Sequence, residues 1–428
     1  MTKIIHILPH SPPLAAYQCG PEDLPPLSSN PSDNDYAIKI DEPPYWICFA
    51  QNDFHTKLAY TTLENTNEFE IECWRPYRMA TQVYSKKIKG VFHRLFPSCD
   101  VKYGRYKFGE RSKLLIEALR EKISEGGIIV HLHGLHDHTT NRILRTIDFS
   151  NTPVIATQRG GAHPSYYLSR RPWFLAPYLL AEWLGERLTF DSIDNFIIQS
   201  KVEYEYIKRA YNHKQVSHLQ DGLNFSEHKE IKKQTARNKL GISSNSKILL
   251  YVGKIIRERG AHNVLWAYQK LKSKNTNYEL YCIGVNESDE LYPIFSKSDC
   301  HLIPRQTVEE LVYYYSAADV SIYPPDRNEF DYCVDFAGIS NFNIESLAHN
   351  TPVLTSLLFH FLGTDEEKKL LGLEYEGRDN MISQILEIVN NEKDYSNCRE
   401  ISRKYYDRHK NTLNIINSYR NLENKYDL

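Results

Sequence analysis

Two cations, Lys254 and Arg259, stand between two glycines, Gly253 and Gly260, directly after the apolar segment Leu249–Val252. A buried strand that ends at Gly253 would bring both cations to the edge of a sheet, and a helix is expected to start near Gly260. Cations beside a helix N-terminus bind phosphate groups, because the free N–H groups and the helix dipole add to the attraction. The spacing indicates a diphosphate site. A solvated basic loop would, however, show the same residues.

A second segment, Gly338-Ile339-Ser340-Asn341, is a loop of mostly small residues, and Glu345 follows it. Such a loop lets backbone N–H groups approach phosphate or sugar oxygens. Glu345 is expected about one turn into the next helix, where its carboxylate could accept hydrogen bonds from both hydroxyls of a ribose. Together the two segments predict a nucleotide site.

The wider sequence around these residues resembles a known family. Ala337–Val353 resembles the Gly-rich loop and helix of family 4 glycosyltransferases, in which a Glu, seven residues and a second Glu precede Ala-x-x-Gly-x-Pro-Val. Asn350 stands at the Gly of that motif, and Asn tolerates a left-handed backbone. Thr307–Pro325 resembles the family's helix, Ala-Asp and apolar strand, and Gly127–Gly134 resembles its strand ending in His-x-His-Gly. The resemblance implies the α/β GT-B fold, with two Rossmann-like domains facing across a cleft and a C-terminal helix crossing back.

The resemblance also implies the chemistry. The expected activity is that of a retaining group 1 glycosyltransferase, which moves a sugar from a nucleotide diphosphate to a glycan or lipid-linked acceptor in cell-surface polysaccharide or glycolipid synthesis. No cofactor, metal or nucleic acid is expected. The donor-binding residues it implies are Gly253, Lys254, Arg259, Gly338, Ile339, Ser340, Asn341 and Glu345. The catalytic residues it implies are Lys254, Arg259, Arg159 and His133, with His163 and Asp53 on the acceptor side.

Three positions depart from the family's pattern. Ala337 replaces the first Glu, whose carboxylate faces the donor sugar in relatives, and Asp335 or Asp331 could substitute for it. Lys254 and Arg259 exchange the usual order of Arg and Lys, which keeps both charges but changes their geometry. Arg159 stands where the family commonly has His. We therefore expect the protein to bind the diphosphate and the ribose of the donor as the family does, whereas the sequence does not predict which sugar it selects.

Alternative functions remain at this stage. The loss of the Glu at position 337 would also fit a GT-B-like protein that binds its ligand with little or no catalysis. A dense group of histidines, His131, His133, His136 and His138, could instead belong to a metallohydrolase. A metallohydrolase with the metal-binding motif His-x-His-x-Asp-His would need Asp where the chain has Leu135. We therefore expect a strand end at which one or two histidines contact substrate and the others are solvated.

Alternating apolar and amphipathic segments predict two parallel α/β domains. We expect an acceptor-binding domain over 1–222, a nucleotide-sugar-binding domain over 223–405 and a C-terminal helix over 406–428 that packs on the first domain. The polar stretch Asn224–Ser246 is interpreted as a linker with one short helix. The predicted strands are Ile4–Leu8, Tyr45–Ala50, Phe69–Cys73, Gly90–Phe96, Ile128–Leu132, Val154–Thr157, Asn195–Gln199, Val216–Leu219, Lys247–Val252, Tyr278–Ile283, His301–Ile303, Val320–Tyr323 and Pro352–Leu354. The predicted helices of the first domain are Asp53–Leu63, Arg111–Ser124, Thr140–Thr146, Pro172–Leu188 and Lys201–Tyr211.

The amino-acid composition narrows the classes of protein to which the chain could belong. The chain of 428 residues has 52 Lys+Arg and 54 Asp+Glu, which argues against a dedicated nucleic-acid binder. Eight scattered cysteines without a C-x-x-C pair, and a start without a signal peptide, favour the cytoplasm. A basic segment between Cys73 and Lys122 and the stretch Ser169–Trp183 suggest peripheral contact with the inner face of the plasma membrane. An exposed basic face and an ordinary buried helix would explain them equally well.

Overall fold

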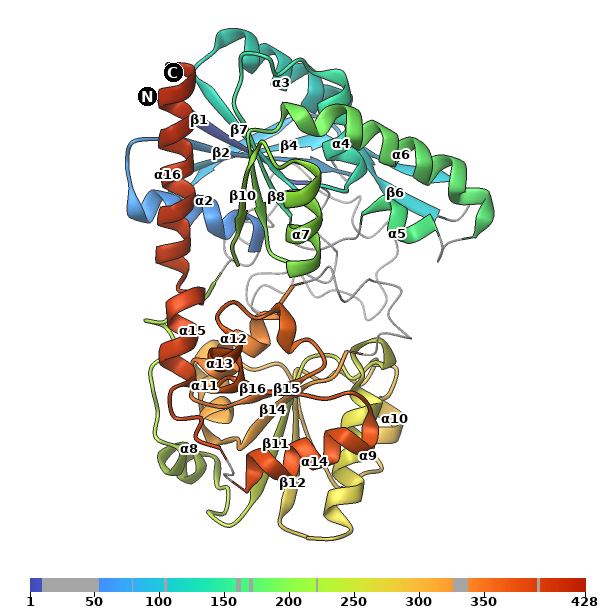
Figure 1. Ribbon diagram of the computed structural model, residues 1–428, viewed down its shortest axis with the longest axis vertical. Coiled ribbons are helices and arrows are strands. Elements are labelled where there is room, and N and C mark those ends of the chain that lie inside the picture. Colours follow the sequence, from blue (N-terminus) through green and yellow to red (C-terminus); the bar gives the residue numbers. More distant parts are fainter. Residues whose placement is uncertain are drawn as a thin grey trace. The chain divides into compact units, whose positions relative to one another are not determined.

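The computed structural model describes residues 1–9, 54–78, 80–103, 106–158, 163–168, 172–220, 222–325, 338–390 and 393–428. The chain divides into two compact units (Figure 1). The N-terminal unit comprises residues 1–199, 203–219 and 412–428, and the C-terminal unit comprises residues 200–202 and 220–411.

The N-terminal unit is built on a sheet whose described strands follow the order β10-β9-β8-β7-β1-β2-β4-β3. All neighbours are parallel except β3, which runs antiparallel to β4 at one edge. These strands are β1 (Lys3–Ile7), β2 (Glu70–Tyr77), β3 (Tyr84–Ile88), β4 (Val91–Pro97), β7 (Ile128–His133), β8 (Val154–Gln158), β9 (Asn195–Ile198) and β10 (Gln215–His218). A separate antiparallel hairpin joins β5 (Cys99–Tyr103) to β6 (Tyr106–Arg111).

Both faces of this sheet are covered by helices, because alternate residues of each buried strand point to opposite faces. In β1, Ile5 and Ile7 belong to one hydrophobic cluster and Ile4 to another. The first cluster takes apolar residues from α3 (Lys113–Glu125), α4 (His138–Thr146) and α7 (Lys201–Ala210). The second takes them from α2 (Phe54–Asn65) and α16 (Arg408–Tyr426). The remaining described helices of this unit are α5 (Pro164–Leu168), η2 (Trp173–Leu175), α6 (Ala176–Thr189) and η3 (Phe190–Ser192).

The C-terminal unit holds a parallel sheet of order β13-β12-β11-β14-β15-β16 in its described residues. Its strands are β11 (Lys247–Val252), β12 (Tyr278–Ile283), β13 (His301–Ile303), β14 (Val320–Tyr323), β15 (Val353–Thr355) and β16 (Gly372–Glu374). Its helices are α8 (Lys233–Leu240), η4 (Arg257–Arg259), α9 (Ala261–Lys272), α10 (Tyr292–Phe295), α11 (Val308–Ala317), α12 (Asn341–Leu347), η6 (Leu358–His360), α13 (Asp365–Lys369), α14 (Arg378–Val389) and α15 (Cys398–Tyr406).

The expected linker over Asn224–Ser246 is the main correction in this unit. It does contain one short helix, α8, as expected, but Phe225, Ala236 and Ile242 are buried in the unit's hydrophobic clusters. The polar composition reflects an exposed face of a packed segment. It does not reflect a free connection.

The predicted strands of both series are confirmed within a few residues, except Tyr45–Ala50, which lies outside the described part of the chain. The sequence reading missed β3, β5, β6 and β16. The C-terminal segment is two helices, since the backbone at Asp407 leaves the helix to bridge Leu223. Among the described helices, none combines the length and the hydropathy that a bilayer crossing requires.

Candidate functional site

The first candidate segment follows β11 in the C-terminal unit. Gly253 has a φ of 134°, and a Cβ atom at this position would lie 2.8 Å from Nη1 of Arg259. Glycine therefore leaves the space in which the Arg259 guanidinium lies beside the end of the strand. Lys254 is exposed, and its carbonyl oxygen accepts a hydrogen bond of 2.8 Å from the hydroxyl of Tyr251.

Neither Lys254 nor Arg259 forms an ion pair with any carboxylate in the described residues, whereas the adjacent Arg257 lies 3.2 Å from Glu290. Burial raises the pKa of the Tyr323 hydroxyl, and the positive charge of Arg259 acts against this shift. Two exposed cations without a carboxylate partner in the described part of the chain are suited to a dianionic ligand such as a diphosphate.

A tight turn sets the start of α9 beside these cations. Gly260 has left-handed backbone angles, with φ 69° and ψ 14°, and precedes α9 with no side chain capping the helix. A Cβ atom here would lie only 1.5 Å from the carbonyl oxygen of Pro324, which follows β14. The turn is therefore packed against the backbone at the carboxyl end of the neighbouring strand. In parallel α/β sheets this edge is the usual place for ligands.

The second candidate segment reaches the same edge of the sheet. Gly338 has a left-handed φ of 69°, Ile339 is buried, Ser340 is half-buried and the exposed Asn341 begins α12. The ring of Phe342 lies 6.1 Å from that of Tyr323, whose hydroxyl is within the field of Arg259. The loop and the cations are thus connected through this aromatic pair.

Glu345 is half-buried in α12 and is held by a residue that the sequence reading missed. Its Oε2 accepts a hydrogen bond of 2.6 Å from the hydroxyl of Tyr315 in α11, whose side chain is fully buried. Burial and the adjacent Glu345 carboxylate both raise the pKa of Tyr315, so this hydroxyl keeps its proton and remains a donor. A capping box between Thr307 and Glu310 fixes the start of α11. The only sequence signal for Tyr315 was its place in a run of three tyrosines.

The left-handed backbone conformation expected at Asn350 is confirmed. Asn350 has a φ of 57° at the turn between α12 and β15. Its side-chain oxygen accepts from the backbone N–H of Arg399, and its amide donates to Glu230. Asn therefore provides both the backbone geometry of the family's glycine and two side-chain contacts.

Several candidate residues lie outside the described part of the chain. They are Asp53, Arg159, Asp331, Asp335 and Ala337. In the N-terminal unit, His133 ends β7 and is fully buried, with its Nε2 2.9 Å from Nδ1 of His6. His163 is also buried and shares a hydrogen bond of 2.7 Å with Tyr206. Their roles on the acceptor side stay predictions.

The expectation that most of the histidine group is solvated is wrong. His131 is fully buried, and both of its ring nitrogens are engaged, one with Tyr419 and one with Thr157, each at 2.6 Å. His136 lies between Glu186 and Glu203, at 3.1 and 2.8 Å. Burial alone would lower the pKa of His136, but the two carboxylates outweigh it and raise the pKa to about 10.

The group of histidines with a spacing suited to a metal ion differs from the one considered in the sequence. Among the residues that the structure describes, it is His6, His131 and His133, which offer ring nitrogens within 4.8 Å of one another. The rings of His131 and His133 stack with centroids 4.5 Å apart. Because His131 uses both nitrogens for Tyr419 and Thr157, the geometry is that of a buried hydrogen-bonded layer between the sheet and α16.

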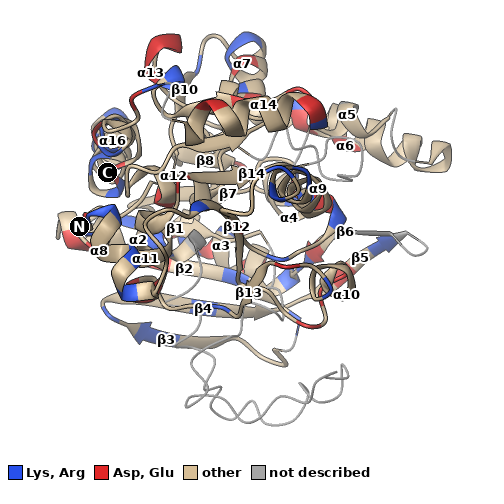
Figure 2. Cartoon of the chain, turned by 90° about the horizontal axis from the view of Figure 1, so that it is seen from below, with Lys and Arg blue, Asp and Glu red and all other residues tan. Residues whose placement is uncertain are grey.

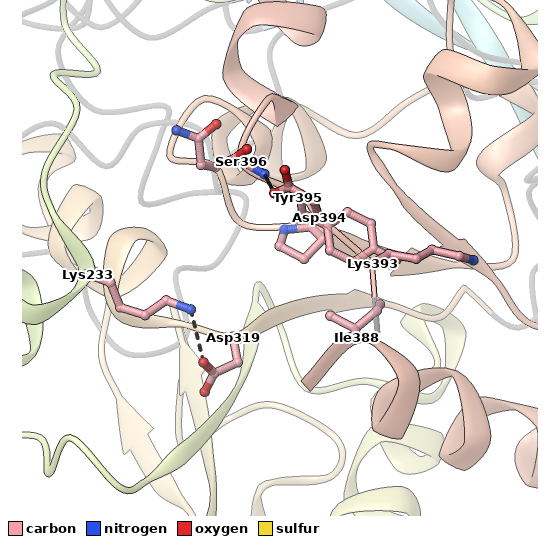
Figure 3. A pocket seen from close by; sticks show the side chains of 9 residues that line it. Lys233, Asp319, Ile388, Lys393, Asp394, Tyr395 and Ser396 are labelled. Atoms are coloured by element: carbon pink, nitrogen blue, oxygen red, sulfur yellow. Dashed lines mark hydrogen bonds and ion pairs between the residues drawn. The ribbon is translucent and has the colours of Figure 1, made fainter. Parts of the chain in front are cut away.

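A pocket of about 350 Å³ lies elsewhere on the C-terminal unit (Figure 3). Asp319 and Pro352, in its lining, directly precede β14 and β15, so the pocket opens at the amino edge of the sheet. Lys233 and Asp319 in this lining are paired at 3.0 Å. The pocket contains none of the candidate donor-site residues, which belong to the opposite edge.

Two largely parallel sheets, each packed with helices in a unit of its own, are the architecture of GT-B proteins. The chain matches a sucrose-phosphate synthase of Thermosynechococcus elongatus over 98% of its own length and 99% of that chain, with a TM-score of 0.64 and 15% identity. It matches the Anabaena protein HepE, solved in complex with UDP, over 98% of its length and all of that chain, with a TM-score of 0.58 and 10% identity. These similarities establish the GT-B fold.

The sequence comparisons point to a family of transferases. Residues 232–405 match the family described as glycosyl transferases group 1. The capsular polysaccharide biosynthesis glycosyltransferase CapM of Staphylococcus aureus is 26% identical over 113 residues. That alignment covers 26% of this chain and 27% of CapM. The residues that match the family, 232–405, include Lys254, Arg259 and Glu345.

Proposed function

We propose that the protein is a retaining glycosyltransferase that transfers a sugar from a nucleotide diphosphate donor to a glycan or lipid-linked acceptor. The observation that carries the proposal is a pair of exposed cations, Lys254 and Arg259, which lie at the carboxyl edge of a sheet and have no carboxylate partner among the described residues; both fall within residues 232–405, which match the group 1 glycosyltransferases. Similarity to HepE, solved with UDP, supports a nucleotide ligand. Similarity to CapM supports a role in cell-surface polysaccharide or glycolipid synthesis.

In the proposed reaction the bond between the sugar's anomeric carbon and the diphosphate oxygen breaks, and the nucleoside diphosphate leaves with the bonding electron pair. Lys254 and Arg259 neutralise the negative charge that develops on the leaving group, so they stabilise the transition state more than the ground state. The acceptor hydroxyl attacks on the same face, and its proton passes to the departing diphosphate. These cations take the electrostatic role that a metal ion has in other transferases.

The remaining donor contacts come from the second segment. Glu345, oriented by Tyr315, accepts hydrogen bonds from the ribose hydroxyls. Backbone N–H groups of Gly338 to Asn341 bind donor oxygens. Arg159, His133, His163 and Asp53 are the residues proposed for the acceptor side. The enzyme would work in the cytoplasm, at the inner face of the plasma membrane when its acceptor is a lipid.

The test compares three variants in a sugar-transfer assay with a panel of nucleotide sugars. Arg259→Ala and Glu345→Ala should each lower transfer about 100-fold or more, as removal of a transition-state donor does elsewhere. Arg257→Ala is the matched control, because Arg257 lies two residues from Arg259 but is paired with Glu290. Equal activity of Arg259→Ala and the Arg257→Ala control would overturn the assignment of the diphosphate site.

A second function, ligand binding with little catalysis, is favoured by Ala337, which stands where the family has a sugar-facing Glu. It predicts that a nucleotide sugar binds and is stable in the presence of the protein. Chromatography of the nucleotide products separates the two functions, since transfer and hydrolysis both release a nucleoside diphosphate, and binding alone releases none.

A further inference from the structure

Helix α6 and the short η2 turn before it present apolar side chains to solvent. Trp173 and Leu188 are 85% and 82% exposed, and Leu184 between them is 53% exposed. The exposed apolar residues recur at the spacing of one helical face; they are Trp173, Phe174, Pro177, Leu180, Ala181, Leu184 and Leu188. We call this set the α6 stripe. An apolar face of a helix normally packs on a core, so its exposure calls for a partner.

The opposite face of α6 carries carboxylates, and these are buried. Glu186 accepts from His136 at 3.1 Å and from Asn141 at 2.9 Å. Glu182 is paired with Arg145 at 3.1 Å and accepts from Asn141 at 3.0 Å. The charged partners lie on the loop after β7 and on α4, which are parts of the same unit. The usual polarity of a surface helix is therefore inverted.

The buried contacts of Glu182 and Glu186 fix the rotation of the helix about its axis. Turning the α6 stripe inward would take both carboxylates away from Arg145, His136 and Asn141. It would leave the buried His136, whose pKa Glu186 and Glu203 together raise to about 10, with Glu203 as its remaining carboxylate partner of the two. Separating a buried charge from its partners is strongly unfavourable. The structure thus holds the α6 stripe outward and does not let it collapse onto the core.

The charge at the exposed positions of the α6 stripe and its segment is positive. Between Pro172 and Phe190, all of which is described, the exposed positions include one charged residue, Arg187, whose guanidinium lies over the ring of Trp183. Elsewhere in the same unit, the segment between Cys73 and Lys122 has thirteen Lys or Arg residues and four Asp or Glu residues, and several of its cations are in ion pairs. Lysines of this segment lie on β3 and β5 (Figure 2). Cationic residues attract anionic lipid headgroups within a Debye length.

We propose that the α6 stripe lies in the interface of an anionic lipid bilayer, with Trp173, Leu184 and Leu188 inserted at the boundary between headgroups and acyl chains. This rests on the proposed function, because it is a lipid-linked acceptor that would make the location useful. A bilayer fits the α6 stripe better than a second copy of the chain, since Arg187, the charged residue at its exposed positions, is attracted to anionic lipid and would face its own copy in a symmetric contact. Helices of this kind bind through buried apolar area plus attraction to headgroups.

Co-flotation with phosphatidylcholine vesicles, with and without phosphatidylglycerol, tests the proposal. The wild-type protein should float with the anionic vesicles and lose binding as salt is raised. The double variant Leu184→Glu/Leu188→Glu should bind at least about tenfold more weakly, because two apolar side chains that leave water are replaced by anions. The matched control is Leu114→Glu on α3, another leucine of the same unit that is 43% exposed. It should float like the wild type.

Three further measurements separate the possible failures. Thermal melting checks that the double variant folds, and Trp173→Ser provides a second variant should it not. A nucleotide-sugar thermal shift that persists in the double variant shows that the donor site is intact, so loss of flotation is not loss of the proposed function. Equal flotation of the double variant and wild type would overturn the proposal. So would a wild-type dimer in light scattering that the double variant converts to monomer.

Discussion

Replacing Gly260 by alanine is the sharpest probe of how the candidate donor site is built. The residue has left-handed angles, φ 69° and ψ 14°, so any Cβ costs about 1 to 2 kcal/mol of backbone strain. The new Cβ would also lie 1.5 Å from the Pro324 carbonyl oxygen and 2.6 Å from its carbonyl carbon. Both atoms are backbone, so side-chain rotation cannot relieve the overlap. Overpacking of this kind adds a further penalty of about 1 to 3 kcal/mol.

Gly241→Ala is the matched control, because it isolates the strain from the overlap. Gly241 has nearly the same angles, φ 70° and ψ 23°, lies in the same unit and has no heavy atom within 4 Å of an added Cβ. The control should lower the melting temperature by roughly 2 to 8 °C and Gly260→Ala by roughly 4 to 20 °C, always by more than the control. Gly260→Ala should also weaken nucleotide-sugar binding, since its turn positions Arg259. Equal melting temperatures of the two variants would refute the packing of this turn on Pro324.

Three further predictions follow from single contacts. Tyr315→Phe removes the 2.6 Å hydrogen bond to Glu345 and should weaken donor binding in calorimetry by about tenfold; unchanged affinity would remove Tyr315 from the site. Tyr419→Phe removes the hydrogen bond to His131 and should lower the free energy of unfolding by about 1 to 2 kcal/mol in urea titrations, and an unaltered value would contradict the docking of α16 through this bond. Burial lowers the pKa of His349 from 6.5 to about 3, so the unfolded chain binds a proton that the folded protein does not, and stability should fall as pH drops below about 6.5. His349→Gln should flatten this acid dependence of the melting temperature; an unchanged slope would exclude His349 as a cause.

Much of the fold was predictable because buried parallel strands leave a simple signal. Segments such as Ile128–Leu132 and Lys247–Val252 are short apolar runs, and they form β7 and β11. The strands that were missed lack this signal. β3 is an edge strand rich in exposed lysine, and β16 has three residues, Gly372–Glu374. Their pairing is decided by neighbouring strands, which the local sequence does not encode.

The candidate site, like the fold, could be predicted from the sequence only in part. Some positions could be predicted because the backbone conformation restricts the residue type. These are Gly253, Gly260 and Asn350, each of which has a positive φ. The role of Tyr315 could not be predicted from the sequence, since it depends on how α11 packs on α12. The buried state of His136 was equally hidden, because its partners Glu186 and Glu203 lie 50 and 67 residues away along the chain.

The central claim is that the C-terminal unit binds the diphosphate of a nucleotide sugar through Lys254 and Arg259. A thermal-shift screen of UDP-, GDP- and ADP-sugars tests it most directly, because a ligand at about 100 times its dissociation constant stabilises the folded protein by about 2.7 kcal/mol. We predict that the sugars of one nucleotide raise the melting temperature of the wild type and of Arg257→Ala, and that the shift is lost in Arg259→Ala. A screen in which no nucleotide sugar shifts the wild type, or in which Arg259→Ala shifts as much as the wild type, would contradict the account.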